Sequence, residues 1–154
     1  NALNLVGGQN AVSNLITNGG SVNILAHGTS LNNFLIDTRG LNHGMFVGGS
    51  RNVINGGRIR ALGSEGNHGC YAIYMGAAGA FGGTKENILS NICCGGSYPG
   101  EVNTNLWHAG IFDEVNVDRN TYSCIHAYDA ENEWALAGAD NHVFHCWNKT
   151  TWVV

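Results

Sequence analysis

The sequence predicts an all-β fold, built as a solenoid of about six short rungs over residues 1–154. Three observations support this prediction. One short pattern returns along the whole chain, its apolar runs are too short for helices, and none of them shows helical spacing. The pattern is an apolar run with glycine, a polar turn that often holds asparagine, and a second apolar run, as in NLVGGQNAVSNLI from Asn4.

The repeats differ in length, which favours one kind of solenoid over others. The frame of leucine-rich repeats and the strict six-residue period of a left-handed helix are both absent. Rungs of variable length fit a right-handed parallel β-helix, in which turns can lengthen without breaking the stacked strands. A β-sandwich with similar strands is the alternative. The six openings start at Leu5, Leu25, Phe46, Tyr74, Ile111 and Leu136.

Asparagine recurs in the turn that follows each opening. Its side chain tolerates left-handed backbone geometry and can hydrogen-bond to its stacked counterparts. We therefore expect a column of turn asparagines, formed by Asn10, Asn32, Asn52, Asn87, Asn120 and Asn141.

The composition limits the class of protein. Only 12% of residues are charged but 44% are apolar, so the chain can bury a core. The net charge of −4, without a Lys/Arg cluster, argues against nucleic acid as a partner. No apolar run has the length of a membrane span. The five cysteines fit no disulfide framework, so we expect buried free thiols. The start at Asn1, without Met, suggests a fragment of a longer protein.

From Asn4 to Trp147 the chain resembles the pectate-lyase-like parallel β-helix superfamily, and within it the bacteriophage tailspikes. The resemblance rests on the pattern of polar turns and short apolar runs in segments such as SRNVINGGRI and KENILSNICC. It implies an extracellular homotrimer in a virion tail that binds or cuts a host bacterial surface polysaccharide. The apolar ending TTWVV also favours a trimer, because a solenoid must cover its ends and its apolar flank.

The second runs can be aligned on Ile59, Ile92 and Ile125, which we expect to point inward. Side chains alternate along a strand, so their neighbours should point outward. One expected outer column is Arg58, Asn91, Cys124 and His145, and the other is Arg60, Cys93, His126 and Trp147. Arg58, Arg60, His126, Trp134 and Trp147 are the predicted glycan-binding residues.

Carboxylates gather in two segments, GIFDEVNVD and YDAENEW. Glycoside hydrolysis needs two carboxyl groups that flank the scissile bond, roughly 5 to 10 Å apart. The candidate catalytic residues are Asp113, Glu114, Glu131 and Glu133. Trp134 could stack on a sugar and raise one carboxyl pKa by desolvation. The motifs CIH and HVFHC do not have zinc spacing, so we expect no metal and no cofactor.

Three functions fit these features. The first is a tailspike or tail-fibre segment that recognises a host surface glycan, with or without cutting it. The second is a structural or processed assembly segment of a virion protein. The third is a fragment of a bacterial polysaccharide lyase or epimerase, with a base and a cation drawn from Arg58, Arg60 and His126.

Overall fold

The computed structural model describes residues 2–5, 11–13, 16–18, 21–39, 43–62, 70–76, 84–95, 107–127, 130–148 and 152–153. These residues form strands, turns and bends, and no helix occurs among them. The predicted all-β class is therefore confirmed. The parallel sheets described below are compatible with a parallel β-helix.

One sheet has six strands, and every pair of neighbours in it is parallel. Its order follows the sequence, because each strand pairs with the one contributed by the next passage of the chain. The strands are β1 (Ala2–Leu5), β4 (Ser21–Ile24), β6 (Met45–Val47), β8 (Tyr71–Met75), β11 (Trp107–Asp113) and β15 (Ala130–Leu136).

The second sheet has ten strands, and all its pairs are parallel except β17 with β18. It comprises β2 (Ala11–Ser13), β3 (Ile16–Asn18), β5 (Ser30–Arg39), β7 (Val53–Leu62), β10 (Ile88–Gly95), β13 (Thr121–Ser123), β14 (His126–Ala127), β16 (His142–Phe144), β17 (Cys146–Asn148) and β18 (Trp152–Val153). A short parallel pair joins β9 (Thr84–Lys85) to β12 (Val117–Asp118).

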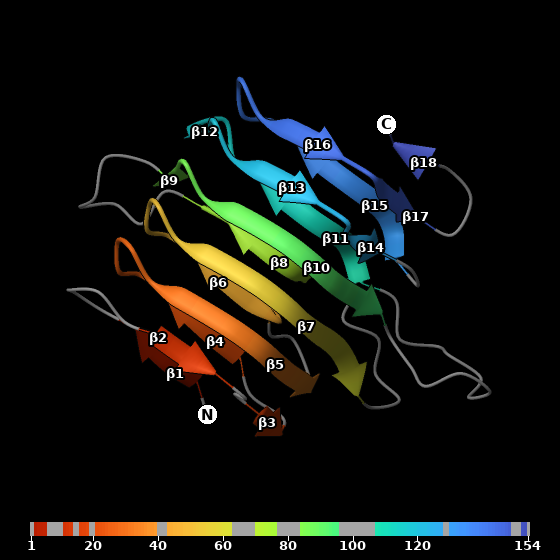
Figure 1. Cartoon of the computed structure of the whole chain (residues 1–154). Helices are drawn as coiled ribbons and strands as arrows, with labels where there is room; N and C mark the ends of the chain where they lie inside the picture. Colours follow the sequence, from red (N-terminus) through yellow and green to blue (C-terminus); the bar gives the residue numbers. More distant parts are fainter. Residues whose placement is uncertain are drawn as a thin grey trace.

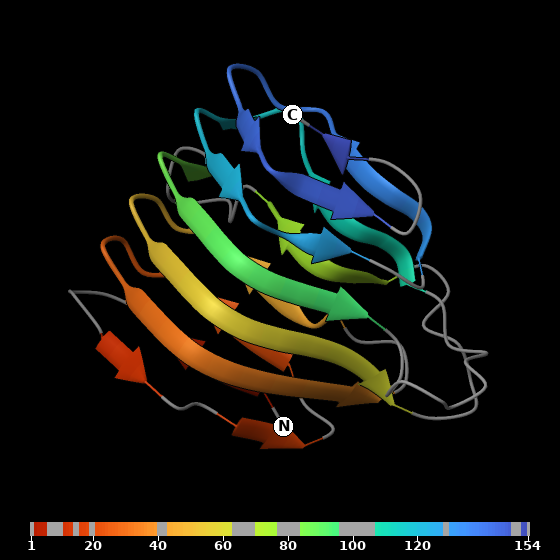
Figure 2. The ribbon, with the colours of Figure 1, turned by 45° about the vertical axis from the view of Figure 1, so that its right-hand side comes forward.

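The chain alternates between the two large sheets. From β4 to β10 the chain visits β5, β6, β7 and β8 in turn, so each of these passages adds one strand to each large sheet. The other passages add two short strands to the ten-stranded sheet: β2 with β3, β13 with β14, and β16 with β17. Figure 1 shows the two sheets as two layers, with strands following one another from red to blue, and Figure 2 shows the same order from a second direction. We call one such passage a winding.

The strands of the ten-stranded sheet are longer than the sequence pattern predicts. β5 and β7 each run for 10 residues, because a left-handed residue inside each strand bends it without ending the pairing. These positions lie opposite one another in successive windings. They are Asn33 (φ 54), Gly56 (φ 67), Asn91 (φ 56), Cys124 (φ 52) and His145 (φ 49).

The predicted isoleucine column is correct in direction, and its register is correct for Ile92 with Ile125 but wrong for Ile59. Ile59, Ile92 and Ile125 are all buried. However, Ile59 pairs with Ile36 and Cys94, whereas Ile92 pairs with Gly57. The offset of two residues leaves each side chain on the same face of the sheet.

Packing at Gly57 accounts for this register. A Cβ atom there would lie 2.5 Å from the ring of Phe34, so that ring occupies the space that a side chain would need.

A ladder of asparagines joins the windings at the corner before the ten-stranded sheet. The backbone N–H of Asn52 donates to Oδ1 of Asn87 at 2.9 Å, and that of Asn87 donates to Oδ1 of Asn120 at 2.9 Å. The N–H of Asn120 in turn donates to Oδ1 of Asn141 at 2.8 Å. Four of the six predicted turn asparagines therefore form a hydrogen-bonded column.

The other two predicted members do not join this ladder. Asn32 lies within β5 opposite Asn55, and Thr29 takes the ladder position in that winding, with its N–H on Oδ1 of Asn52 at 2.7 Å. Asn10 lies outside the described residues. The left-handed backbone falls one residue before each ladder asparagine, at Arg51, Glu86, Arg119 and Asp140.

Candidate functional site

Asp113, a predicted catalytic residue, lies at the end of β11 in an inward-facing position between Met75 and Leu136. It is completely buried, at 0% exposure. The N–H groups of Ala137 and Gly138 donate to its Oδ1, the latter at 2.9 Å. Burial raises its pKa above the usual aspartate value, and the two backbone hydrogen bonds oppose this rise. Its catalytic role stays a prediction, but its contacts are those of a buried hydrogen-bond acceptor.

Glu114 is half-buried and follows Asp113 at the corner after β11. The hydroxyl of Tyr74, one winding earlier, donates a short hydrogen bond to Oε1 of Glu114. Burial is the main cause that raises the pKa of Tyr74 to about 12, and the hydrogen bond and charge of Glu114 add to it. The phenol therefore stays protonated and acts as a donor at neutral pH.

The register separates Glu131 and Glu133 from Asp113. Asp113 pairs with Leu136, so these glutamates lie five and three residues earlier on β15. At about 3.3 Å per residue, they are roughly 17 and 10 Å away along the strand. Their catalytic roles also stay predictions.

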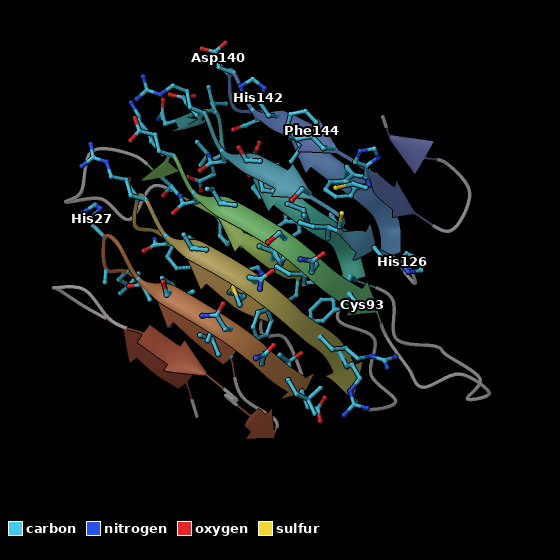
Figure 3. The ribbon with its side chains drawn as sticks, viewed as in Figure 1. His27, Cys93, His126, Asp140, His142 and Phe144 are labelled. Atoms are coloured by element: carbon cyan, nitrogen blue, oxygen red, sulfur yellow. The ribbon has the colours of Figure 1, made fainter. Side chains whose placement is uncertain are left out.

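Arg58, rather than Arg60, belongs to the predicted column with His126 and Trp147. Arg58 pairs with Cys93, which pairs with His126, which pairs with Trp147. Figure 3 shows Cys93 and His126 near the ends of β10 and β14. Burial lowers the pKa of His126, so it is neutral at physiological pH.

Arg60 is withdrawn from the surface at 3% exposure. Its Nε and Nη2 atoms donate to Oδ1 and Oδ2 of Asp37, both at 2.6 Å. This two-bond ion pair engages the guanidinium. Arg60 pairs with Gly95 rather than Cys93, so its expected place in the column with Cys93 is wrong.

Trp134 pairs with Ile111 and packs against the core. That placement makes it part of an inward-facing column rather than an outer platform. Its predicted stacking against a sugar stays a prediction, as does that of Trp147, which pairs with His126 and Trp152 in the backbone register.

An aromatic cluster covers part of the outer face of the six-stranded sheet. Tyr71 stacks on Phe112, with ring centroids 4.4 Å apart and planes 10° apart. Tyr74 meets Phe46 nearly edge-on at 5.2 Å. His43 stacks on Tyr71 at 5.2 Å, and burial lowers its pKa, so it is neutral. All five rings are half-buried, and they come from three successive windings.

We define the aromatic cluster as His43, Phe46, Tyr71, Tyr74 and Phe112, with Glu114 at its margin. Sequence reasoning missed it. A signal was present, because Phe46 and Tyr74 stand at equivalent places in two openings and are register partners. Phe112 pairs with Tyr74 in the next winding, one residue later than the aligned openings suggest.

Comparison with protein-family models, with curated proteins and with solved structures finds no match to this chain. Among the described residues, no group of three or more His, Cys, Asp or Glu side chains is arranged to hold a metal ion. The part of the chain that the structure describes includes no helix long and apolar enough to cross a membrane. All five cysteines are free, and Cys70, Cys94 and Cys146 are buried as expected. Cys124 is exposed and Cys93 is partly exposed, so the expectation of buried thiols is wrong at these two.

Proposed function

We propose that the windings form a right-handed parallel β-helix of about six rungs, of the pectate-lyase-like type. Three features support this: the alternation between two parallel sheets, the six strands of the smaller sheet, and the asparagine ladder. A right-handed path is the strong rule for parallel strands joined by crossovers.

We further propose that the chain recognises a bacterial surface polysaccharide as a segment of a bacteriophage tailspike or tail fibre. The observation that carries this proposal is the aromatic cluster with Glu114. Partly exposed rings offer flat apolar faces to the C–H faces of sugars, and a carboxylate accepts hydrogen bonds from sugar hydroxyls. Its span of three windings suits an extended polymer.

The cluster also indicates which kind of glycan would bind. No Lys or Arg belongs to it, its histidine is neutral, and its charged residue is an acid. A neutral, hydroxyl-rich glycan therefore suits it better than an anionic one. Arg58 lies on the ten-stranded sheet, where its cation offers a separate surface for acidic groups.

A polysaccharide-binding assay tests this function. The chain is titrated with a panel of capsular and O-antigen polysaccharides, and the affinities of Tyr71→Ala and Phe112→Ala are compared with that of the unaltered chain. Each substitution should weaken binding about two- to tenfold, since an aromatic stacking contact contributes about 0.5 to 1.5 kcal/mol. Phe144→Ala is the matched control, because Phe144 is an exposed ring, at 48%, on the other sheet. Equal loss in all three variants would contradict the assignment.

Cleavage of the glycan is a separate proposal. Of the four predicted carboxylates, Glu114 has a described side chain that is half-exposed, so we propose it as the acid of any hydrolysis. New reducing ends that disappear in Glu114→Gln would support a hydrolase. Absorbance of an unsaturated uronate would instead support the lyase alternative. If the chain binds the glycan and forms neither product, it acts as an adhesin without cleavage.

We also propose a homotrimer in the virion tail. Val53 and Ile88 are register partners with exposed apolar side chains, at 41% and 45% exposure. Such an exposed apolar patch suits a subunit interface. A subunit interface also fits the alternative function, a structural or processed assembly segment of a virion protein. Sedimentation at micromolar concentration tests the trimer, and Val53→Lys should shift it toward monomer. A monomeric unaltered chain would contradict it.

A further inference from the structure

The asparagine ladder leaves a defined hydrogen-bonding edge at Asn141. In each earlier winding, the ladder residue's carbonyl oxygen accepts an N–H from the next winding. Thr29 O accepts from Val53 at 2.8 Å, Asn52 O from Ile88 at 2.9 Å, Asn87 O from Thr121 at 2.8 Å, and Asn120 O from His142 at 2.8 Å. Asn141 O is the next acceptor of this series, and no described residue lies beyond it to donate.

The corner beside this ladder carries alternating charges. Arg51, Glu86, Arg119 and Asp140 occupy equivalent left-handed positions in successive windings. Nε of Arg51 lies 2.9 Å from Glu86, and Nη2 of Arg119 lies 3.1 Å from the same carboxylate. Asp140 continues the alternation and is exposed. A further winding would therefore complement it with a cation.

Among the described residues, the inward columns also end at this edge. Trp134, Leu136 and Val143 are only partly buried, whereas their register partners Ile111, Asp113 and Tyr122 are completely buried. In Figures 1 and 2, β15 and β16 form the last layer at this end, and Figure 3 shows Asp140, His142 and Phe144 along it. β18 pairs with β17 and not with β16.

We propose that this edge binds an extended strand of a partner protein, parallel to β16, with Lys or Arg followed by Asn at the corner. The cation would pair with Asp140. The asparagine would accept the N–H of Asn141 through its Oδ1, as each ladder asparagine does for the winding before it. Apolar residues of the strand would cover Trp134, Leu136 and Val143. This is strand addition to a sheet edge, in which the ion pair with Asp140 selects the residue at one position of the added strand.

The probe is a fluorescent peptide, DRNTYSSIHA, which copies residues 118–127 with serine in place of Cys124. In the structure this segment pairs in parallel with β16 from the other side through β13. Fluorescence anisotropy with the full chain should show saturable binding. A peptide with Arg119→Glu should bind about fivefold more weakly, as expected for exchanging an exposed ion pair for repulsion.

A charge exchange on the chain gives the decisive comparison. Asp140→Lys should reverse the preference, so that the peptide with Arg119→Glu binds more tightly than the original. The matched control is Asp118→Lys, which changes an acid at a corner in the previous winding; it should leave the preference for the arginine peptide intact. No saturable binding up to about 1 mM, or equal affinity of the two peptides for the unaltered chain, would overturn the proposal. Self-association of the chain that Asp140→Lys abolishes, without peptide binding, would assign the edge to a second copy instead.

Discussion

The carboxylate of Asp113 lies within hydrogen-bonding distance of the side-chain amide of Asn141, whose Nδ2 donates to Oδ2 of Asp113 at 2.8 Å. The same amide donates to the carbonyl oxygen of Val117 at 3.0 Å. Asp113 therefore connects the last residue of the asparagine ladder with the end of β11. It is an acceptor for four donors in a place where its column neighbours, Met75 and Leu136, are apolar.

Asp113→Asn should lower the free energy of unfolding by about 1 to 3 kcal/mol, because one acceptor oxygen is replaced by a donor that faces other donors. Urea unfolding measures this change. Asp118→Asn is the control, since that side chain is partly exposed and should change stability by less than about 1 kcal/mol. Equal stability of Asp113→Asn and the unaltered chain would contradict the buried-acceptor role.

Asp113 should also give stability a characteristic pH dependence. Burial raises its folded-state pKa, so the folded chain binds this proton more tightly than the unfolded chain. The pH-dependent part of its contribution is therefore fully present below the unfolded pKa of about 3.9 and is lost as pH rises through the raised value, whereas the hydrogen bonds that Asp113 accepts remain. The difference in unfolding free energy between the unaltered chain and Asp113→Asn should shrink across that range. A difference that grows with pH would contradict the raised pKa.

Asn87→Ala should destabilise the chain by about 2 to 4 kcal/mol, since several ladder groups lose partners in a buried site. Its Nδ2 donates to Gly49 O at 3.0 Å and to Oδ1 of Asn120 at 2.9 Å, and its Oδ1 accepts the N–H of Asn52. Asn55→Ala, at a half-exposed position within β7, should cost less than about 1 kcal/mol. Thermal or urea unfolding of both variants measures these losses of stability. If Asn55→Ala and Asn87→Ala lose similar amounts, the ladder has no special stabilising role.

Gly49→Ala should prevent folding or cost more than about 3 kcal/mol. A Cβ atom at this position would lie 1.8 Å from the carbonyl oxygen of Ala26, and backbone atoms cannot rotate away. Gly76→Ala is the milder comparison, because its nearest obstacle is the ring of Phe46 at 2.8 Å, which can move. Circular dichroism and urea unfolding measure the stability of both variants. The prediction is wrong if Gly49→Ala is more stable than Gly76→Ala.

The Tyr74 phenol should remain largely protonated up to pH 11, since its pKa is raised to about 12. Glu114→Gln removes a charge and changes the acceptor, so the pKa of Tyr74 should fall. It should stay above the ordinary value, because burial is the largest cause of the rise. NMR titration of the ring carbon that bears the hydroxyl measures this pKa, with Tyr74→Phe to assign the signal. An unchanged pKa in Glu114→Gln would show that the hydrogen bond is not formed in solution.

Much of the architecture follows from local chemistry. Short apolar runs with glycine and asparagine predict strands and turns, and alternation places Ile59, Ile92 and Ile125 inward. The register does not follow, because a shift of two residues preserves every inward and outward assignment. The contact between Phe34 and Gly57 favours the observed alignment, and that contact joins different windings.

The candidate site was harder to predict for the same reason. Asp113 resembles a surface acid in the sequence, and its burial depends on donors from the next winding. Arg60 is buried in an ion pair with Asp37, which lies 23 residues earlier. In the aromatic cluster, His43 and Tyr71 fall outside the repeated openings, so their proximity to Phe112 emerges only once the windings are stacked.

The asparagine ladder has a consequence for how such a chain can change over evolution. Its successive members are 23, 35, 33 and 21 residues apart, yet each one restores the same alignment with its neighbour. Insertions and deletions between two members thus change one winding and leave the alignment at its corner intact. A lineage can remodel its surface one winding at a time, and acquire new specificities, while the ladder keeps its hydrogen bonds.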